Sequence, residues 1–154
     1  MDVWRLRRLV KWALAESDSG KAVDLNAHAL GVFLVDEAEM ARTNWEHLRH
    51  EGATDVITLD FGGQAGGAPR PGPLLGEIFI CPVIAEAFAR EHGTTWSEEV
   101  ARYLIHGILH LRGYDDRNAT RRKRMKREEE RLVRAAAACF PLSRLAKGSR
   151  VVGR

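Results

Sequence analysis

The spacing of apolar and polar residues predicts where helices and strands lie along this chain. Residues 1 to 15 interleave basic and apolar side chains at helical spacing, which predicts an amphipathic helix. Residues 23 to 35 end in an apolar run, as expected for a strand that enters the core. Residues 54 to 61 alternate strictly and are rich in β-branched types, and residues 76 to 81 resemble them, so two further strands are predicted.

Turn and capping residues predict the segments around these strands. Asp36 can cap a helix over residues 37 to 50, which ends near Gly52. Residues 62 to 75 contain five glycines and three prolines, which predicts a flexible loop that is either a lid over a substrate or a surface excursion. Helical spacing returns over residues 83 to 92.

The second half of the chain is predicted to be helical. Thr95 and Glu98 have the spacing of a capping box in front of a long apolar helix, and either Asp115 or Asn118 opens a last helix. This order of elements indicates an α+β fold, in which a small mixed β-sheet packs with several helices around a central apolar helix. We expect a single domain over residues 1 to 154, with a basic C-terminal helix and tail from about residue 117.

Composition agrees with a single domain and also indicates the expected cellular location. A chain of 154 residues with 45% hydrophobic content can bury a sizeable core. We expect no membrane association, since no apolar run is long enough to cross a bilayer. Cys81 and Cys139 are far apart and indicate neither a disulfide framework nor a zinc ribbon, so a cytoplasmic location is expected.

Two histidines stand one turn apart in the long apolar helix. His106 and His110 share a helix face, with Cβ atoms about 5 to 6 Å apart. Gly113 suits the left-handed position that ends a helix, so the chain can fold back there. The next turn can then bring a carboxylate oxygen of Asp116 to a metal ion held by the two histidines. Histidines in a buried helix can instead merely satisfy hydrogen bonds, but two imidazoles followed by Tyr-Asp-Asp bury much polarity, which a metal explains. The pattern therefore predicts a three-ligand metal site.

The residue after the first histidine narrows the chemistry of this site. Zinc proteases with His-Glu-x-x-His place a general-base glutamate there, whereas this chain has Gly107. Peptidase chemistry is thereby disfavoured, although a metal can itself activate a bound water. Three protein ligands and an open fourth position indicate a catalytic ion rather than a structural one.

Three separated motifs resemble one known family. Residues 106 to 115 match the signature His-Gly-x-Leu-His-Leu-x-Gly-Tyr-Asp-His of the YbeY family at every specified position. Residues 54 to 58 are similar to the family's Thr-Asp-Val-Leu-Ser, and residues 76 to 82 to its Gly-Asp-Ile-x-Ile-Cys-Pro. Asn44 also fits. The resemblance spans roughly residues 36 to 116, in the family's order.

The resemblance implies a metal-dependent endoribonuclease that cuts single-stranded precursors of 16S-type ribosomal RNA and acts in ribosome quality control. It implies one bound ion, Zn²⁺ in the first place. The expected partners are precursor ribosomal RNA, the small ribosomal subunit and its assembly factors. Two alternatives stay open, namely an RNA-binding ribosome-assembly factor with a structural metal and a metal-dependent hydrolase of another bond.

The chain departs from the family at two positions. The family's third histidine is Asp116 here, which keeps a ligand that zinc accepts and makes other divalent ions possible. Asp115 is the competing candidate for the third ligand. Because it matches the family's own aspartate, it is expected to contact a metal ligand rather than the ion itself. The family often carries an arginine at the position of Leu48, so we assign neighbouring Arg49 a catalytic contact with phosphate, with a solvated surface arginine as the alternative.

Charge is unevenly divided along the chain. Residues 117 to 154 hold thirteen Lys and Arg against three Glu, whereas residues 1 to 116 hold eleven against eighteen acidic residues. Because the basic segment directly follows the predicted metal site, we expect it to bind an RNA backbone. The alternative is a solvated helical face on which residues 128 to 130 pair with neighbouring arginines. The residues predicted to bind RNA are Arg117, Arg121, Arg122 and Arg124.

Overall fold

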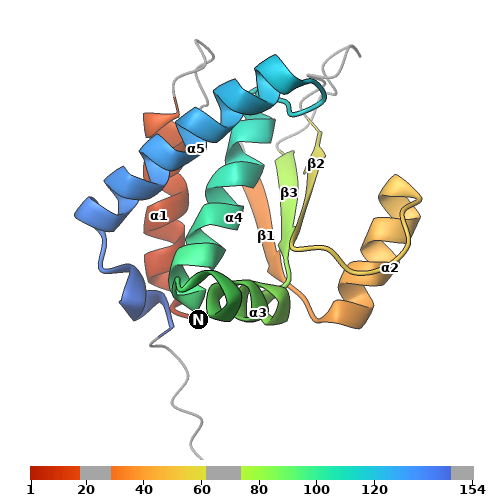
Figure 1. Ribbon diagram of the computed structural model, residues 1–154, viewed down its shortest axis with the longest axis horizontal. Helices are drawn as coiled ribbons and strands as arrows, with labels where there is room; N and C mark the ends of the chain where they lie inside the picture. Colours follow the sequence, from red (N-terminus) through yellow and green to blue (C-terminus); the bar gives the residue numbers. More distant parts are fainter. Residues whose placement is uncertain (18–28, 62–73, 147–154) are drawn as a thin grey trace, which may run out of the picture.

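The computed structural model describes residues 1–17, 29–61 and 74–146, in which a three-stranded sheet packs with five α-helices (Figure 1). The helices are α1 (Val3–Glu16), α2 (Glu37–Leu48), α3 (Pro82–His92), α4 (Trp96–Leu111) and α5 (Ala119–Cys139), followed by a 3-10 turn, η1 (Leu142–Leu145). The strands are β1 (Ala29–Leu34), β2 (Val56–Asp60) and β3 (Leu74–Ile80). The predicted α+β fold with a small mixed sheet is confirmed.

Strand β3 occupies the centre of the sheet. It pairs with β1 in parallel and with β2 in antiparallel orientation. The strand begins at Leu74, so the end of the predicted loop over residues 62 to 75 is wrong: pairing with Ala29 extends β3 in a way that local sequence does not reveal. The rest of that loop and the first part of the predicted strand 23 to 35 lie outside the described residues.

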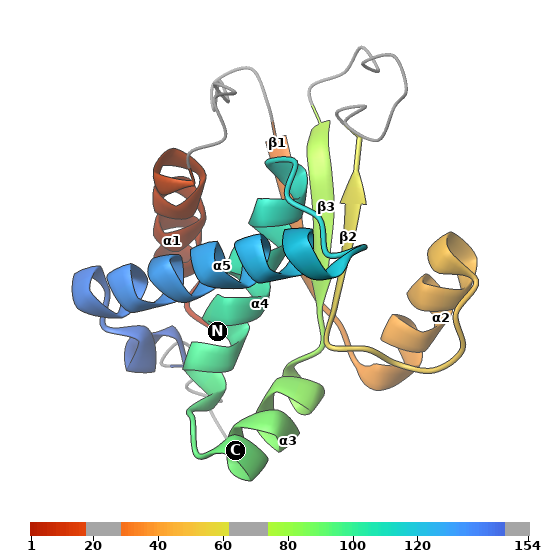
Figure 2. The ribbon, with the colours of Figure 1, turned by 45° about the horizontal axis from the view of Figure 1, so that its top comes forward.

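Helix α4 lies between the sheet and helices α1 and α5 (Figures 1 and 2). It begins with the predicted capping box, in which Thr95 and Glu98 satisfy each other's backbone amides. Gly107 faces the sheet, where an added Cβ would stand 2.9 Å from Ile78 Cδ1 and from Thr58 Oγ1. The glycine of the histidine motif therefore permits the helix to approach the sheet closely.

Helices α1 and α5 cover the other side of α4. Figure 2 shows α5 crossing α4, and apolar residues of all three helices form one core cluster with β3. The side chain of Asn118 accepts a hydrogen bond from the Arg121 amide at 2.9 Å, so Asn118, and not Asp115, caps α5. Among the described residues, no helix is both long and apolar enough to span a bilayer.

Helix α2 stands apart from the main core, at the edge marked by β2 (Figure 1). A small second cluster of Val35, Met40, Ile57 and Cys81 anchors it. The helix ends at Leu48, earlier than predicted, because Arg49 adopts a left-handed conformation with φ 56°. The Asn44 side chain donates to the Gly52 carbonyl at 2.9 Å and closes the turn that follows. Asn44 therefore shapes the backbone between α2 and β2.

Candidate metal centre

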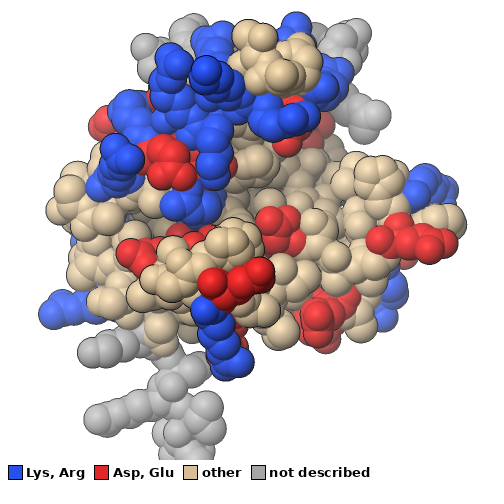
Figure 3. All heavy atoms as spheres, viewed as in Figure 1, with Lys and Arg blue, Asp and Glu red and all other residues tan. Residues whose placement is uncertain are grey.

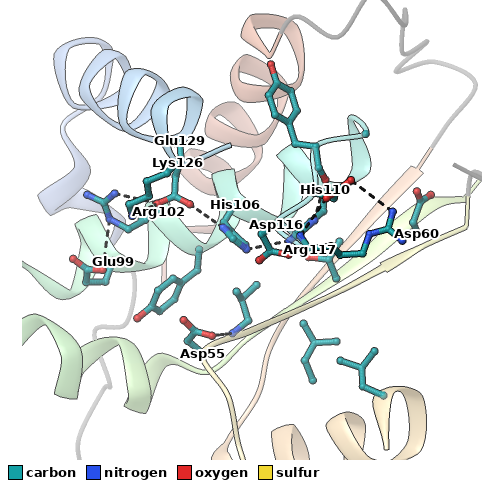
Figure 4. A pocket seen from close by; sticks show the side chains of 18 of the residues that line it. Asp55, Asp60, Glu99, Arg102, His106, His110, Asp116, Arg117, Lys126 and Glu129 are labelled. Atoms are coloured by element: carbon teal, nitrogen blue, oxygen red, sulfur yellow. Dashed lines mark hydrogen bonds and ion pairs between the residues drawn. The ribbon is translucent and has the colours of Figure 1, made fainter. Parts of the chain in front are cut away.

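The two imidazoles and the carboxylate predicted as ligands lie together in the structure. One ligand atom each from His106, His110 and Asp116 falls within 4.8 Å of the others. The two Nε2 atoms are 3.1 Å apart, close to the separation of about 3.3 Å that two nitrogens take on a tetrahedral ion with bonds of about 2.0 to 2.1 Å. Figure 4 shows these side chains close together among the labelled residues of the pocket, between Arg102 on one side and Asp60 on the other. The donor set and its spacing fit a divalent ion.

The turn after α4 brings the third ligand back to the helix. Gly113 has φ 92°, its amide donates to the His110 carbonyl at 3.0 Å, and the Tyr114 amide donates to the Leu109 carbonyl at 3.0 Å. These two bonds define a Schellman motif, which ends the helix and reverses the chain. Asp116 follows on the exposed side of the turn. The geometry predicted for Gly113 is confirmed.

The second nitrogen of each imidazole is fixed by its own acceptor. His106 Nδ1 lies 2.8 Å from Glu129 Oε2, and His110 Nδ1 lies 3.1 Å from the Tyr114 carbonyl oxygen. A carbonyl oxygen and an ionised carboxylate only accept, so both Nδ1 atoms donate. Each Nε2 then presents its lone pair to the site. Acceptors of this kind orient histidine ligands and increase their basicity.

Glu129 is a buried carboxylate on α5, with only 4% of its surface exposed. Its Oε1 atom accepts from Lys126 at 2.9 Å and from Arg102 at 3.2 Å, while Oε2 accepts from His106. Burial would raise the pKa of Glu129, but hydrogen bonds from His106 and Lys126 outweigh it and lower the pKa to about 2. The carboxylate is therefore ionised, and it links the basic helix to a candidate metal ligand.

His110 is held in its neutral form. Burial lowers the pKa of His110, and the neighbouring His106 lowers it further, against the opposing influence of Asp116. A neutral imidazole is the form that binds a metal. The environment of His110 therefore favours coordination over protonation.

The ligands lie in a cleft of about 1120 Å³, and its two sides differ in chemistry. We call the side formed by α4, the following turn and α5 the α4–α5 wall; its cleft-lining cations are Arg102, Arg117 and Lys126. We call the opposite side the α2–α3 wall; its lining residues are Leu48, His50 and Phe88. Figure 3 shows Lys and Arg side chains gathered over α5, above the hollowed part of this face.

Of the four residues predicted to bind RNA, Arg117 lines the cleft, whereas Arg121, Arg122 and Arg124 lie on α5 outside its lining. The side chain of Arg117 is 76% exposed. Arg121 donates to Asp115 at 2.8 Å, and the guanidinium of Arg124 lies 5.3 Å from the centre of the Tyr114 ring. Arg122 is exposed in the first turns of α5. Asp115 thus pairs with arginines, and the carboxylate that contacts an imidazole is Glu129.

Arg49 does not lie among the residues that line the cleft. Its left-handed backbone turns the side chain toward Trp45, where the guanidinium lies 5.7 Å from the ring centre. The neighbouring positions Leu48 and His50 line the cleft instead. The structure therefore leaves the assignment of Arg49 as a phosphate contact without geometric support.

Sequence reasoning did not identify Glu129. It treated residues 128 to 130 as solvated partners of nearby arginines, yet Glu129 lies on the buried face of α5. The sequence holds a signal, because position 129 falls at helical spacing from the apolar residues of that face, which are Met125, Leu132, Val133 and Ala136. A carboxylate in an apolar stripe requires a buried partner.

The fold and site define a class of protein, a small α+β domain whose central helix carries a His-x-x-x-His pair that could hold a metal ion. The chain belongs to the YbeY family, since the family model described as Endoribonuclease YbeY matches residues 1–137. The predicted family membership is therefore confirmed.

Relatives and a solved structure agree with this membership. Endoribonuclease YbeY of Bordetella avium is 35% identical over 130 residues, which cover 84% of this chain and 78% of the relative. Endoribonuclease YbeY of Aquifex aeolicus is also 35% identical, over 84% of this chain and 81% of its own length. The solution structure of a Thermotoga maritima protein is 26% identical and superposes with a TM-score of 0.53, covering 97% of this chain and 87% of that one.

Proposed function

We propose that this chain is a metal-dependent endoribonuclease that cuts single-stranded precursors of ribosomal RNA. The observation that carries the proposal is the convergence of His106, His110 and Asp116 in a cleft whose rim is basic. A bound divalent ion would supply Lewis-acid stabilisation of the charge that develops on the scissile phosphate. The names of the relatives, Endoribonuclease YbeY, support the same reaction class.

The residues that line the cleft would have different roles around the scissile phosphate. His106 and His110 would hold the ion through Nε2, and Asp116 would complete the ligand set from the exposed turn. Glu129 keeps the His106 imidazole in the orientation and tautomer that a metal requires. Arg117 and Lys126 line the cleft beside the ligands and are placed to attract the RNA backbone.

The ion in this proposal is Zn²⁺, with other divalent ions acceptable because Asp116 provides an oxygen ligand. Its carboxylate makes the centre more negative than one with three imidazoles, so a bound water would be less acidic. The proposal further places the protein in the cytoplasm, as one domain that acts on the small ribosomal subunit together with assembly factors.

An RNA-binding assembly factor without nuclease activity is the second candidate. The observation that favours it is the absence of an arginine from the α2 side of the cleft among the described residues, where Leu48 stands and Arg49 turns to Trp45. In this case the ion would only stabilise the end of α4. The basic rim would still bind RNA.

One assay separates the two candidates. Purified protein is incubated with labelled single-stranded RNA, with and without a chelator, beside an Asp116→Ala variant. We expect cleavage by the metal-loaded protein, loss of cleavage with the chelator, and a strong reduction in the variant. Cleavage that the chelator leaves untouched would contradict the metal mechanism. Tight RNA binding without cleavage would establish the assembly-factor function instead.

A further inference from the structure

The two walls of the cleft suit different parts of a nucleotide. Among the described residues, the Lys and Arg side chains that line it lie on the α4–α5 wall, where the carboxylates Glu99, Asp115 and Glu129 pair with them and Asp116 joins the candidate metal ligands. A bound ion together with the exposed Arg117 would attract a phosphate to that side. The α2–α3 wall presents the side chains of Leu48 and Phe88. An apolar or aromatic side chain accepts the face of a base. A strand lying in the cleft is therefore oriented with its bases toward the α2–α3 wall.

Phe88 is the exposed aromatic residue of that wall. It lines the cleft from α3 and remains 39% exposed. The ring of His92 stacks on it, with the ring centres 3.8 Å apart and the planes 12° from parallel. His92 Nδ1 lies 3.0 Å from the Phe88 carbonyl oxygen, which fixes the imidazole in place. One face of the phenyl ring is thereby covered and its orientation is restrained.

We propose that Phe88, backed by His92, forms a stacking site for one unpaired nucleobase of the RNA whose backbone lies on the α4–α5 wall. The inference rests on the proposed function and adds to it a residue that contacts substrate. Leu48, on α2 and 45% exposed, contributes apolar surface to the same wall.

The stacking site explains a preference for single strands in physical terms. A paired base has both faces covered by its neighbours in the helix, and exposing one of them costs a few kcal/mol. An unpaired base can stack on Phe88 without that cost. Stacking on an aromatic ring tolerates every base, because each base has a π-face. The site therefore selects strandedness more strongly than sequence.

The test measures binding of a short 2′-O-methyl RNA with one 2-aminopurine, whose fluorescence is quenched by stacking. The position of the 2-aminopurine is moved along the strand in separate experiments, with metal-loaded protein. We expect Phe88→Ala to lower the affinity by about 5-fold to 100-fold and to remove the quenching at one position. We expect Phe88→Trp to preserve both. Val83→Ala, at a 51% exposed position of α3 outside the cleft lining, serves as the matched control.

The outcomes distinguish the two proposals. Unchanged affinity and unchanged quenching in Phe88→Ala, with a wild-type protein that binds and cuts RNA, would overturn the stacking site alone. A wild-type protein that neither binds nor cuts single-stranded RNA would overturn the proposed function, and the stacking site with it. Equal losses in Phe88→Ala and Val83→Ala would also count against the stacking site, because they would indicate a general effect on α3.

Discussion

On the α4–α5 wall, polar side chains are held by one another, whereas on the α2–α3 wall apolar side chains stand open. Glu129 is 4% exposed and accepts hydrogen bonds from three side chains, while Leu48 and Phe88 are 45% and 39% exposed. The first wall is preorganised for charge, which suits a metal and a phosphate. The second has few fixed contacts and suits a partner that supplies its own apolar surface.

The comparison also separates what the family shares from what this chain has changed. The histidine motif lies on the α4–α5 wall. The two relatives described above, both named Endoribonuclease YbeY, align with this chain over most of their length. Leu48, at the position where the resemblance leads us to expect an arginine, lies on the α2–α3 wall. Differences in how family members hold RNA are therefore expected on the second wall, with the reaction centre kept on the first.

The largest expected effect follows from removing a ligand on the α4–α5 wall. His110→Ala should lower metal affinity by more than the 10-fold to 100-fold typical of changes outside the direct ligands. Metal content after dialysis and competition with a chromogenic chelator measure the loss. His47→Ala, an exposed histidine on α2, is the control and should keep its ion. Full retention of metal by His110→Ala would refute the ligand set.

A smaller loss is expected when the ligands are kept and their support is weakened. Glu129→Gln should lower metal affinity about 10-fold, because it removes the negative charge that accepts from His106 and leaves Arg102 and Lys126 with less compensation beside that imidazole. Glu130→Gln is the matched control, since Glu130 pairs with Arg102 and Lys126 but makes no contact with His106 among the described residues. Similar metal affinities in the two variants would indicate that Glu129 only forms ion pairs and does not support His106 as a ligand.

The charge difference between the walls can be reduced by one substitution. Leu48→Arg adds a cation to the α2–α3 wall and should tighten binding of single-stranded RNA several-fold at low salt. The slope of log affinity against log salt should steepen by about 0.7, the value for one added phosphate contact. Val83→Arg, on α3 outside the cleft lining, controls for the change in net charge. Equal slopes in both variants would show that position 48 does not reach the RNA.

The smallest effect is expected at the rim. Arg117→Ala should weaken RNA binding only a few-fold, because this side chain is 76% exposed and its contact is screened by salt. The salt slope should become shallower by about 0.7 without a change in sequence preference. Arg90→Ala removes an exposed arginine of α3, paired with Glu86, and should leave the slope unchanged. A large loss at position 117 would instead indicate direct contact with the scissile phosphate.

The parts of this structure that depend on local spacing could be predicted from sequence. The histidine pair, the turn at Gly113 and the capping box at Thr95 each span no more than six consecutive residues, and the structure shows the expected geometry at all three. Contacts between distant segments could not be predicted. Glu129 meets His106 only because α5 crosses α4, and Phe88 meets the cleft only because α3 packs beside α4.

Backbone conformation explains the remaining difference at the end of α2. The helix was predicted to continue to residue 50, but Arg49 adopts a left-handed φ of 56°, which arginine rarely takes. The bond from the Asn44 side chain to the Gly52 carbonyl stabilises this turn over a span of eight residues. Helical periodicity alone therefore gives the wrong direction for the side chains that follow Leu48.

The exposed position of Asp116 bears on how the proposed ligand set can vary. The two histidines belong to the central helix, and replacing either would disturb both the proposed ion binding and the hydrogen bonds of the imidazole. Asp116 follows a turn that is already closed by Gly113 and Tyr114, so an imidazole or a carboxylate can stand there without repacking the core. One surface position can thus change the ligands offered to an ion while the rest of the scaffold stays intact.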